Sequence, residues 1–283
     1  MAELIDGKKV SAKIRLDIAK EVADFKSEFS ITPGLAVIIV GENPASLVYV
    51  RNKHKACVEA GMNSIEVKLP EETSEEELLS KIAELNSDDS VHGILVQLPL
   101  PRHIDETRVL NSISPEKDVD AFHPVNVGKI MIGNYNLLPC TPAGVMDLLD
   151  YYNVELSGKR AVVIGRSNIV GKPMTLLLLE RNATVSVCHS RTKDISAYTK
   201  DADVIVVAVG KANFLKADMV KEGAVVVDVG INRLDNGKLC GDVDFEEVSK
   251  VASFITPVPG GVGPMTITTL LKNTLSAAKE SVK

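Results

Sequence analysis

The stretch RAVVIGRSNIVGKP, residues Arg160–Pro173, decides the fold of the C-terminal half. A short apolar run leads directly into a glycine-containing turn and then into a helical pattern. In such a strand-to-helix turn, backbone N–H groups and the helix N-terminus can face a pyrophosphate. The loop departs from G-x-G-x-x-G, because Ser167 takes the second glycine position after Gly165 and Gly171 is displaced. Taken alone, the motif leaves two alternatives open, a nucleotide-binding loop and an ordinary tight βα turn.

Further short β-rich runs follow this stretch, and a similar alternation precedes it. Downstream, the expected strands are residues 183–190, 203–210 and 224–230. Upstream, strands are expected at 35–41, 64–69 and within VHGILVQLPLP, residues 91–101. Helices are expected from Pro44 to about Ala60, from a capping box of Thr73 and Glu76 to about Asn86, and from Thr141 to Asn153. Strands that alternate with helices predict parallel α/β sheets in both halves.

The pattern breaks between Asp118 and Thr141, in a stretch that contains Gly, Pro and Asn. Such a break is typical of a domain boundary. We therefore predict a first α/β domain over residues 1–138 and a second over residues 139–264. No strand follows the last helix, residues 265–283, so we expect it to pack back on the first domain and complete it.

The second strand of the C-terminal half ends in CHSRT, where a binder of NAD usually carries an acid for the ribose hydroxyl. Ser190 and Arg191 stand there instead, and Arg166 lies in the glycine loop. Guanidinium groups suit the additional phosphate of NADP, which an acid would repel. The sequence therefore predicts NADP rather than NAD as the cofactor, and the alternative is that both arginines are solvated surface charges.

Tyr49 and Lys53 are spaced i, i+4 in the helix expected after Pro44, so they share one face. Such a pair can bind an aromatic ring and deliver a proton, provided that burial or nearby charge lowers the pKa of the lysine. A solvated helix face is the alternative. Gln97 interrupts an apolar strand, and a buried amide must find partners. It either makes a structural hydrogen bond or orients Lys53 or a ligand.

Two further segments have both a structural and a functional interpretation. Asp118 and Asp120, in EKDVDAFHP, are either turn-forming residues or carboxylates that grip an aminopyrimidine edge. The segment PVPGGVGPMT, residues 257–266, is either a rigid wall against a ligand or a plain connector between domains.

Composition excludes several classes of protein. The formal net charge of −6 argues against broad nucleic-acid binding, which needs a basic face. No apolar h-region stands at the N-terminus, and no apolar run approaches the roughly 20 residues of a membrane span. The four cysteines lack zinc spacing, so we expect reduced thiols and no metal site. We expect a cytoplasmic protein that binds neither nucleic acid nor membrane.

The motifs occur together in one order over nearly the whole chain: YVRNKHK, VQLPLP, EKDVDAFHP, TPAG, GRSNIVGKP and TPVPGGVGPMT. In this combination the sequence closely resembles the bifunctional methylenetetrahydrofolate dehydrogenase/methenyltetrahydrofolate cyclohydrolase family. No single motif is decisive, but the ordered set is highly specific.

The resemblance implies two α/β domains with the active-site cleft between them. The N-terminal domain would be a three-layer α/β folate domain, and the C-terminal one a Rossmann-like, doubly wound NADP domain. It also implies a homodimer that oxidises 5,10-methylenetetrahydrofolate with NADP and hydrolyses the product to 10-formyltetrahydrofolate. The nearest alternative is a monofunctional dehydrogenase that lacks the hydrolytic step.

By motif match, Lys53 is the expected catalytic lysine, Gln97 would position it, Asp120 would hold the pterin, and Tyr49 would stack on the folate ring. The other expected substrate contacts are Val96, Leu98, Pro259, Gly260, Gly261 and Val262. The expected cofactor contacts are Thr141, Gly165, Arg166, Ser167, Ile169, Ser190, Arg191, Val209, Gly210, Gly230 and Ile231.

One departure from the family pattern concerns the residue after the pterin-binding Asp, which is usually glycine and here is Ala121. The additional methyl group disfavours a positive φ, so we expect a small shift of Asp120.

Three other classes fit less well. A short-chain dehydrogenase places its glycine loop before the Tyr/Lys pair, whereas here the loop follows it. A shikimate dehydrogenase lacks VQLPLP and PGGVGP. A non-catalytic folate or NADPH module would not need Lys53, Gln97 and Asp120 together.

Overall fold

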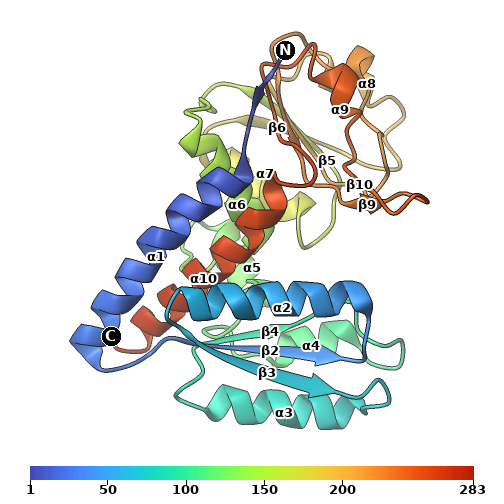
Figure 1. The fold of residues 1–283 in the computed structure, drawn as a ribbon. Helices are drawn as coiled ribbons and strands as arrows, with labels where there is room; N and C mark the ends of the chain where they lie inside the picture. The colour runs from blue at the N-terminus through green and yellow to red at the C-terminus, as the bar shows by residue number, and fades with distance from the viewer. The chain divides into compact units, whose positions relative to one another are not determined.

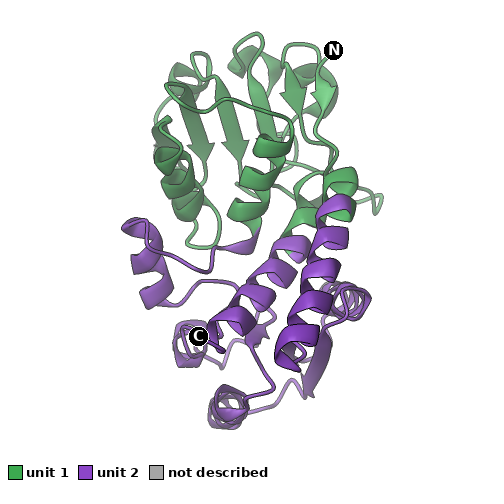
Figure 2. Cartoon of the chain, turned by 90° about the vertical axis from the view of Figure 1, so that its left-hand side faces the viewer, with its two compact units in different colours: residues 1–12, 141–266 green, residues 13–140, 267–283 purple. Residues whose placement is uncertain are grey.

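The computed structural model describes residues 1–44 and 46–283. The chain divides into two compact units, shown in different colours in Figure 2. Unit 1 comprises residues 1–12 and 141–266, and unit 2 comprises residues 13–140 and 267–283. The two long helices α1 (Gly7–Phe29) and α10 (Val262–Glu280) contribute residues to both units.

Unit 2 is built on a three-stranded parallel sheet in the order β3 (Asn63–Leu69), β2 (Gly34–Val40), β4 (Gly93–Val96). All seven residues of β2 are buried, as expected for an apolar central strand covered on both faces. Helix α2 (Pro44–Glu59) lies on one face and α3 (Glu75–Ser87) on the other (Figure 1). The unit is completed by α4 (Glu106–Ser112) and α5 (Pro124–Met131).

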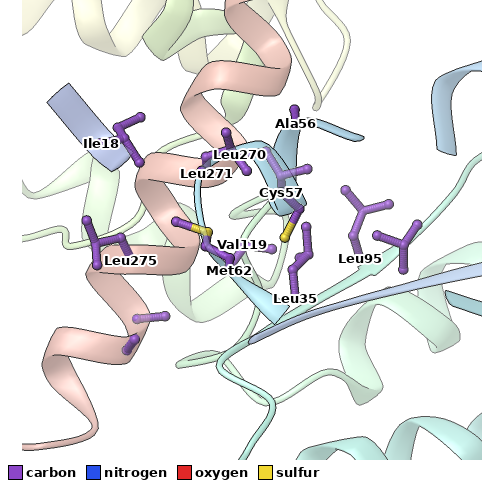
Figure 3. Packing of buried hydrophobic residues seen from close by; sticks show 14 of the residues in the cluster. Ile18, Leu35, Ala56, Cys57, Met62, Leu95, Val119, Leu270, Leu271 and Leu275 are labelled. Atoms are coloured by element: carbon purple, nitrogen blue, oxygen red, sulfur yellow. The ribbon is translucent and has the colours of Figure 1, made fainter. Parts of the chain in front are cut away.

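Two apolar clusters hold the layers of unit 2 together, one on each face of the sheet. The first joins the sheet to residues of α1, α2 and α10, including Ile18, Leu35, Cys57, Leu270 and Leu271 (Figure 3). The second joins the sheet to α3 and α4 through buried aliphatic side chains. The capping box of α3 is formed by Ser74 and Glu77, so the expected pair of Thr73 and Glu76 was wrong by one residue.

Unit 1 is built on a six-stranded parallel sheet in the order β6 (Thr184–Cys188), β5 (Arg160–Ile164), β7 (Val204–Val207), β8 (Val225–Asp228), β11 (Phe254–Ile255), β1 (Glu3–Leu4). The chain runs from β5 outward to β6 and then returns to the other side of β5 as β7. Strand order therefore reverses between β5 and β7, and in open α/β sheets ligands bind at such a switch point, outside the carboxyl ends of the strands.

The remaining elements of unit 1 connect these strands. The helices are α6 (Cys140–Tyr151), α7 (Gly171–Glu180), α8 (Ser196–Thr199), η1 (Ala217–Met219) and α9 (Phe245–Val248). A small hairpin, β9 (Asn232–Arg233) and β10 (Leu239–Cys240), follows β8. In the described ranges 1–44 and 46–283, every helix is too short or too polar to cross a membrane.

The start of the chain differs from the expected arrangement. Residues 1–12 fall in unit 1, whereas the sequence suggested that the first domain begins at residue 1. The reason is that Glu3 and Leu4 pair in parallel with Phe254 and Ile255 at the edge of the six-stranded sheet. A strand of two residues whose partner lies about 250 residues away leaves no local pattern to detect.

Candidate functional site

The side chains of Lys53 and Gln97 meet in unit 2. Lys53 lies in α2, and Gln97 directly follows β4. The Lys53 Nζ donates a hydrogen bond of 3.0 Å to Gln97 Oε1. Lys53 is 8% exposed, so a charged group is held away from bulk water. Gln97 thus contacts Lys53, and it also makes a hydrogen bond to the neighbouring backbone, so both contacts that the sequence offered as alternatives are present.

The amide of Gln97 is oriented by a second hydrogen bond. Its Nε2 donates to the carbonyl oxygen of Leu98 at 2.8 Å. Because Nε2 is engaged there, Oε1 is the atom that faces Lys53. The Leu98–Pro99 peptide bond is cis. The predicted contact residues Val96 and Leu98 flank Gln97, and its amide is oriented by the hydrogen bond to the Leu98 carbonyl.

Asp120 and Cys140 complete the surroundings of Lys53. Burial lowers the pKa of Lys53 below its usual value, and the nearby Asp120 carboxylate opposes this effect. Burial raises the pKa of Asp120, and the Lys53 ammonium opposes that shift. Burial also keeps the pKa of the Cys140 thiol well above its usual value, so the thiol remains protonated. A lowered pKa increases the neutral fraction of the Lys53 amine at a given pH, and a neutral amine can accept a proton.

Cys140 and Asn273 support the Asp120 segment, and neither role was predicted from the sequence. The Cys140 thiol donates to the carbonyl of Val119 at 3.4 Å. Asn273 in α10 is buried, and its Nδ2 donates to the carbonyls of Val119 and Leu138 at 2.8 and 2.7 Å. The only available signal was an Asn at a buried position of an apolar helix, since a buried amide must find partners.

The two aspartates of EKDVDAFHP have different roles. Asp118 accepts hydrogen bonds from the backbone N–H of His123 and from Asn126 Nδ2, both on the α5 side of the turn. Burial raises the pKa of Asp118 to about 6. Asp118 thus stabilises the turn before α5, whereas Asp120 lies near Lys53. Ala121 is buried and adopts a φ of 56°, the left-handed conformation that glycine takes more readily.

Tyr49 lies one helical turn before Lys53 in α2. Its side chain is 41% exposed, in contrast to the buried lysine. The i, i+4 spacing in a continuous helix places both residues on one face, as the sequence suggested. An exposed aromatic ring beside a buried ammonium can stack on a planar ligand.

In unit 1, the glycine loop between β5 and α7 is closely packed. A β-carbon at Gly165, whose φ is 132°, would lie 2.3 Å from the Ala208 carbonyl oxygen. A β-carbon at Gly171 would lie 2.3 Å from the carbonyl oxygen of Gly165. Ser167 Oγ accepts from the backbone N–H groups of Val170 and Gly171 at 3.1 and 3.3 Å. The loop therefore needs glycine at both positions, although it departs from G-x-G-x-x-G.

The predicted phosphate contacts are open to solvent. Arg166, Ser167, Ser190 and Arg191 are exposed. Within residues 1–44 and 46–283, neither Arg166 nor Arg191 forms an ion pair with a carboxylate. Ile169 and Ile231 expose large apolar side chains, at 44% and 49%. Exposed cations and apolar side chains at the carboxyl ends of strands suit a ligand with phosphate groups and flat rings.

The other predicted contacts also lie in unit 1. Val209 and Gly210 follow β7, and Gly230 follows β8. Thr141 forms a hydrogen bond with Thr266 at 3.0 Å between the two hydroxyl oxygens. The segment Pro259–Val262 belongs to this unit, whereas Lys53, Gln97 and Asp120 belong to unit 2. The catalytic candidates thus all lie in unit 2, whereas the Pro/Gly segment and the nucleotide loop both lie in unit 1.

The sheet order and the glycine loop define unit 1 as a dinucleotide-binding α/β unit. Two family models match the chain: the tetrahydrofolate dehydrogenase/cyclohydrolase catalytic domain over residues 5–120, and the NAD(P)-binding domain of the same family over residues 139–282. The chain belongs to the tetrahydrofolate dehydrogenase/cyclohydrolase family, and the predicted resemblance and two-domain α/β fold are confirmed.

Relatives match over their whole length. A protein named bifunctional protein FolD, from Acetivibrio thermocellus, is 61% identical over 282 residues, which cover 100% of this chain and 99% of that protein. The crystal structure of the bifunctional FolD of Campylobacter jejuni has a TM-score of 0.97 and 58% identity, with 99% of this chain and all of that chain covered. FolD of Trypanosoma brucei, complexed with NADP and an inhibitor, has a TM-score of 0.96 and 42% identity, with 100% and 99% covered.

Proposed function

We propose that this protein oxidises 5,10-methylenetetrahydrofolate to 5,10-methenyltetrahydrofolate with NADP and then hydrolyses the product to 10-formyltetrahydrofolate. The observation that carries the proposal is the buried Lys53 ammonium, held by Gln97 Oε1 in the field of Asp120. Relatives named as bifunctional, at up to 61% identity, favour two activities over a dehydrogenase alone.

On the folate side, each residue has a distinct task. Asp120 accepts hydrogen bonds from the amino-pyrimidine edge of the pterin, and the Tyr49 ring stacks on the folate ring system. Val96 and Leu98, with the segment Pro259–Val262, provide further substrate contacts. Lys53 takes the proton that is released when water adds to the methenyl carbon, which requires its neutral amine form. The lowered pKa of Lys53 supports this task because it increases the neutral fraction at a given pH.

The residues of unit 1 fit NADP. Gly165 and Gly171 leave no space for a β-carbon, so the backbone of the loop itself can face a pyrophosphate. Arg166, Ser190 and Arg191 hold the additional phosphate, and Ser167, Ile169 and Thr141 contact the rest of the cofactor. Val209, Gly210, Gly230 and Ile231 border the nicotinamide end. When bound, NADP accepts the hydride that leaves the methylene carbon.

We further propose that the protein is a cytoplasmic homodimer that binds neither nucleic acid nor membrane. The family resemblance supports the dimer, and the net charge of −6 supports the absence of nucleic-acid binding. Light scattering on the purified protein tests the dimer, and a monomer at micromolar concentration would contradict it.

The decisive experiment follows absorbance with methylenetetrahydrofolate and either NADP or NAD. We expect nicotinamide reduction with NADP and only transient accumulation of the methenyl product, which the second step removes. Stoichiometric, lasting accumulation of methenyltetrahydrofolate would instead identify a monofunctional dehydrogenase. Tight ligand binding without turnover would identify a binding module.

A further inference from the structure

Two buried carboxylates of unit 1 lie outside the site described above. Asp228 ends β8 and is 3% exposed, and Asp242 follows β10 and is fully buried. In the part of the chain that the structure describes, residues 1–44 and 46–283, neither forms an ion pair with Lys or Arg. Charges buried without a cation must be stabilised by hydrogen-bond donors, because desolvation would otherwise be very costly.

Asp242 receives four hydrogen bonds. Its Oδ2 accepts from the backbone N–H groups of Val209 and Gly210 at 2.7 and 2.8 Å. Its Oδ1 accepts from the backbone N–H of Lys211 and from Asn232 Nδ2, both at 2.8 Å. Three successive N–H groups of the loop after β7 therefore converge on one carboxylate, which fixes the path of that loop.

Asp228 holds Asp242 in place. Its Oδ1 accepts from the backbone N–H groups of Gly230 and Asp242, and its Oδ2 from that of Val243, all at 2.9 Å. Gly230 packs so closely against Asp242 that residue 230 cannot carry a side chain, because a β-carbon at Gly230 would lie 2.2 Å from Asp242 Cγ. The loops after β7 and β8 are thus tied to the segment that carries Asp242.

This network lies beside the switch point of the sheet. The loop after β7 borders the point where strand order reverses, and the glycine loop after β5 packs against Ala208, directly before Val209. All donors to Asp242 come from residues that neighbour or form the proposed nicotinamide end of the cofactor site. A ligand held at such a switch point depends on the exact course of the strand-end loops.

We infer that Asp242 is a positioning residue for the dehydrogenase reaction: it shapes the loops after β7 and β8 that receive the nicotinamide end of NADP. The inference rests on the proposed NADP site. Asp242 acts through the backbone N–H groups of the loop after β7 and through the Asn232 amide, and it needs both carboxylate oxygens as acceptors. Asparagine, which has the same shape, would turn an N–H₂ group toward N–H donors in either orientation of its amide.

The test compares full-length Asp242→Asn with wild type by NADP titration and by steady-state kinetics. We expect the KM and Kd for NADP to rise about tenfold or more, since a buried donor is left facing another donor. The KM for methylenetetrahydrofolate should change little. Cyclohydrolase turnover of supplied methenyltetrahydrofolate, assayed without NADP, should stay at the wild-type rate. Asp244→Asn, two residues further on at a surface ion pair with Lys216, is the matched control and should leave NADP binding unchanged.

A purely structural role would reduce both activities together and leave the KM for NADP unmoved, and that result would overturn the inference. If Asp242→Asn does not fold, Asn232→Ala removes one of the four donors and should raise the KM for NADP about threefold. An unchanged KM in that variant would overturn the inference equally. Failure of the proposed function would be recognised by a different result, because the wild-type protein would then show no NADP-dependent oxidation.

Discussion

The ammonium of Lys53 donates a 3.0 Å hydrogen bond to Oε1 of Gln97, joining helix α2 to the segment after β4. The two residues are separated by 44 positions, and the parallel pairing of β2 with β4, together with the packing of α2 on the sheet, brings them together. This contact fixes the position of the lysine amine.

Lys53→Met should abolish cyclohydrolase activity, by about 100-fold or more, and reduce the dehydrogenase rate much less. Hydride transfer needs proximity and orientation, whereas addition of water needs a group that takes up a proton. Methionine keeps most of the apolar volume of lysine in its buried site. The measurement is the rate of methenyltetrahydrofolate hydrolysis against that of NADP reduction. Equal residual fractions of the two rates would contradict the assignment.

Substitutions at Gln97 should shift the pH profile of the cyclohydrolase in opposite directions. If neutral Lys53 is the active form, the rate rises with pH through the pKa of Lys53, which burial holds below its usual value. Gln97→Leu removes an acceptor that stabilises the ammonium, so the pKa falls and the profile moves to lower pH. Gln97→Glu places a carboxylate there, so the pKa of Lys53 rises and the profile moves to higher pH.

The measurement is the cyclohydrolase rate from pH 6 to 10 at saturating substrate. Lys55→Ala is the control, because Lys55 lies in the same helix but forms a surface ion pair with Glu59. Shifts of the same sign in both Gln97 variants would show that the profile does not report Lys53.

The strand and helix pattern could be predicted from the sequence because it is local. The strands at Leu35–Gly41 and Arg160–Gly165 were expected where β2 and β5 lie, and Pro44 indeed begins α2. The C-terminal helix begins at Val262, earlier than the expected Met265, because Pro264 fits within a first helical turn.

Contacts between distant segments could not be predicted in this way. The pairing of Glu3 with Phe254 and the support of Val119 by Asn273 depend on residues far apart in sequence. The proposed role of Asp242 could not be predicted for the same reason, since three of its four hydrogen-bond donors are backbone N–H groups, which carry no sequence signal. Lys53, Gln97 and Asp120 were predicted through motifs, whereas Asn273, which supports the Asp120 segment, lies outside every motif.

Gly165→Ala should disrupt the nucleotide loop, because its β-carbon would lie 2.3 Å from a backbone oxygen at a φ of 132°. We expect a loss of about 2–3 kcal/mol in the free energy of unfolding and at least about tenfold weaker NADP binding. Urea unfolding and NADP titration measure the two effects. Gly223→Ala is the control: its φ is 79°, but no atom lies within 4 Å of the new β-carbon, so only about 1 kcal/mol of backbone strain is expected. Equal effects of the two substitutions would contradict the close-packing argument.

Arg191→Ala should weaken NADP binding and leave NAD binding unchanged, because only NADP carries the additional phosphate. The guanidinium is exposed at the end of β6 and forms no ion pair within residues 1–44 and 46–283, so it is available to a ligand. The loss of a charge-assisted hydrogen bond should raise the KM for NADP by about 10- to 100-fold. Arg160→Ala provides the control, since Arg160 is exposed at the opposite end of the sheet, where β5 begins, and pairs with Asp201. The ratio of kcat/KM for NADP to that for NAD should fall in Arg191→Ala and stay constant in Arg160→Ala. A parallel loss with both cofactors would mean that Arg191 contacts a group common to the two, and the basis for preferring NADP would then be sought at Arg166.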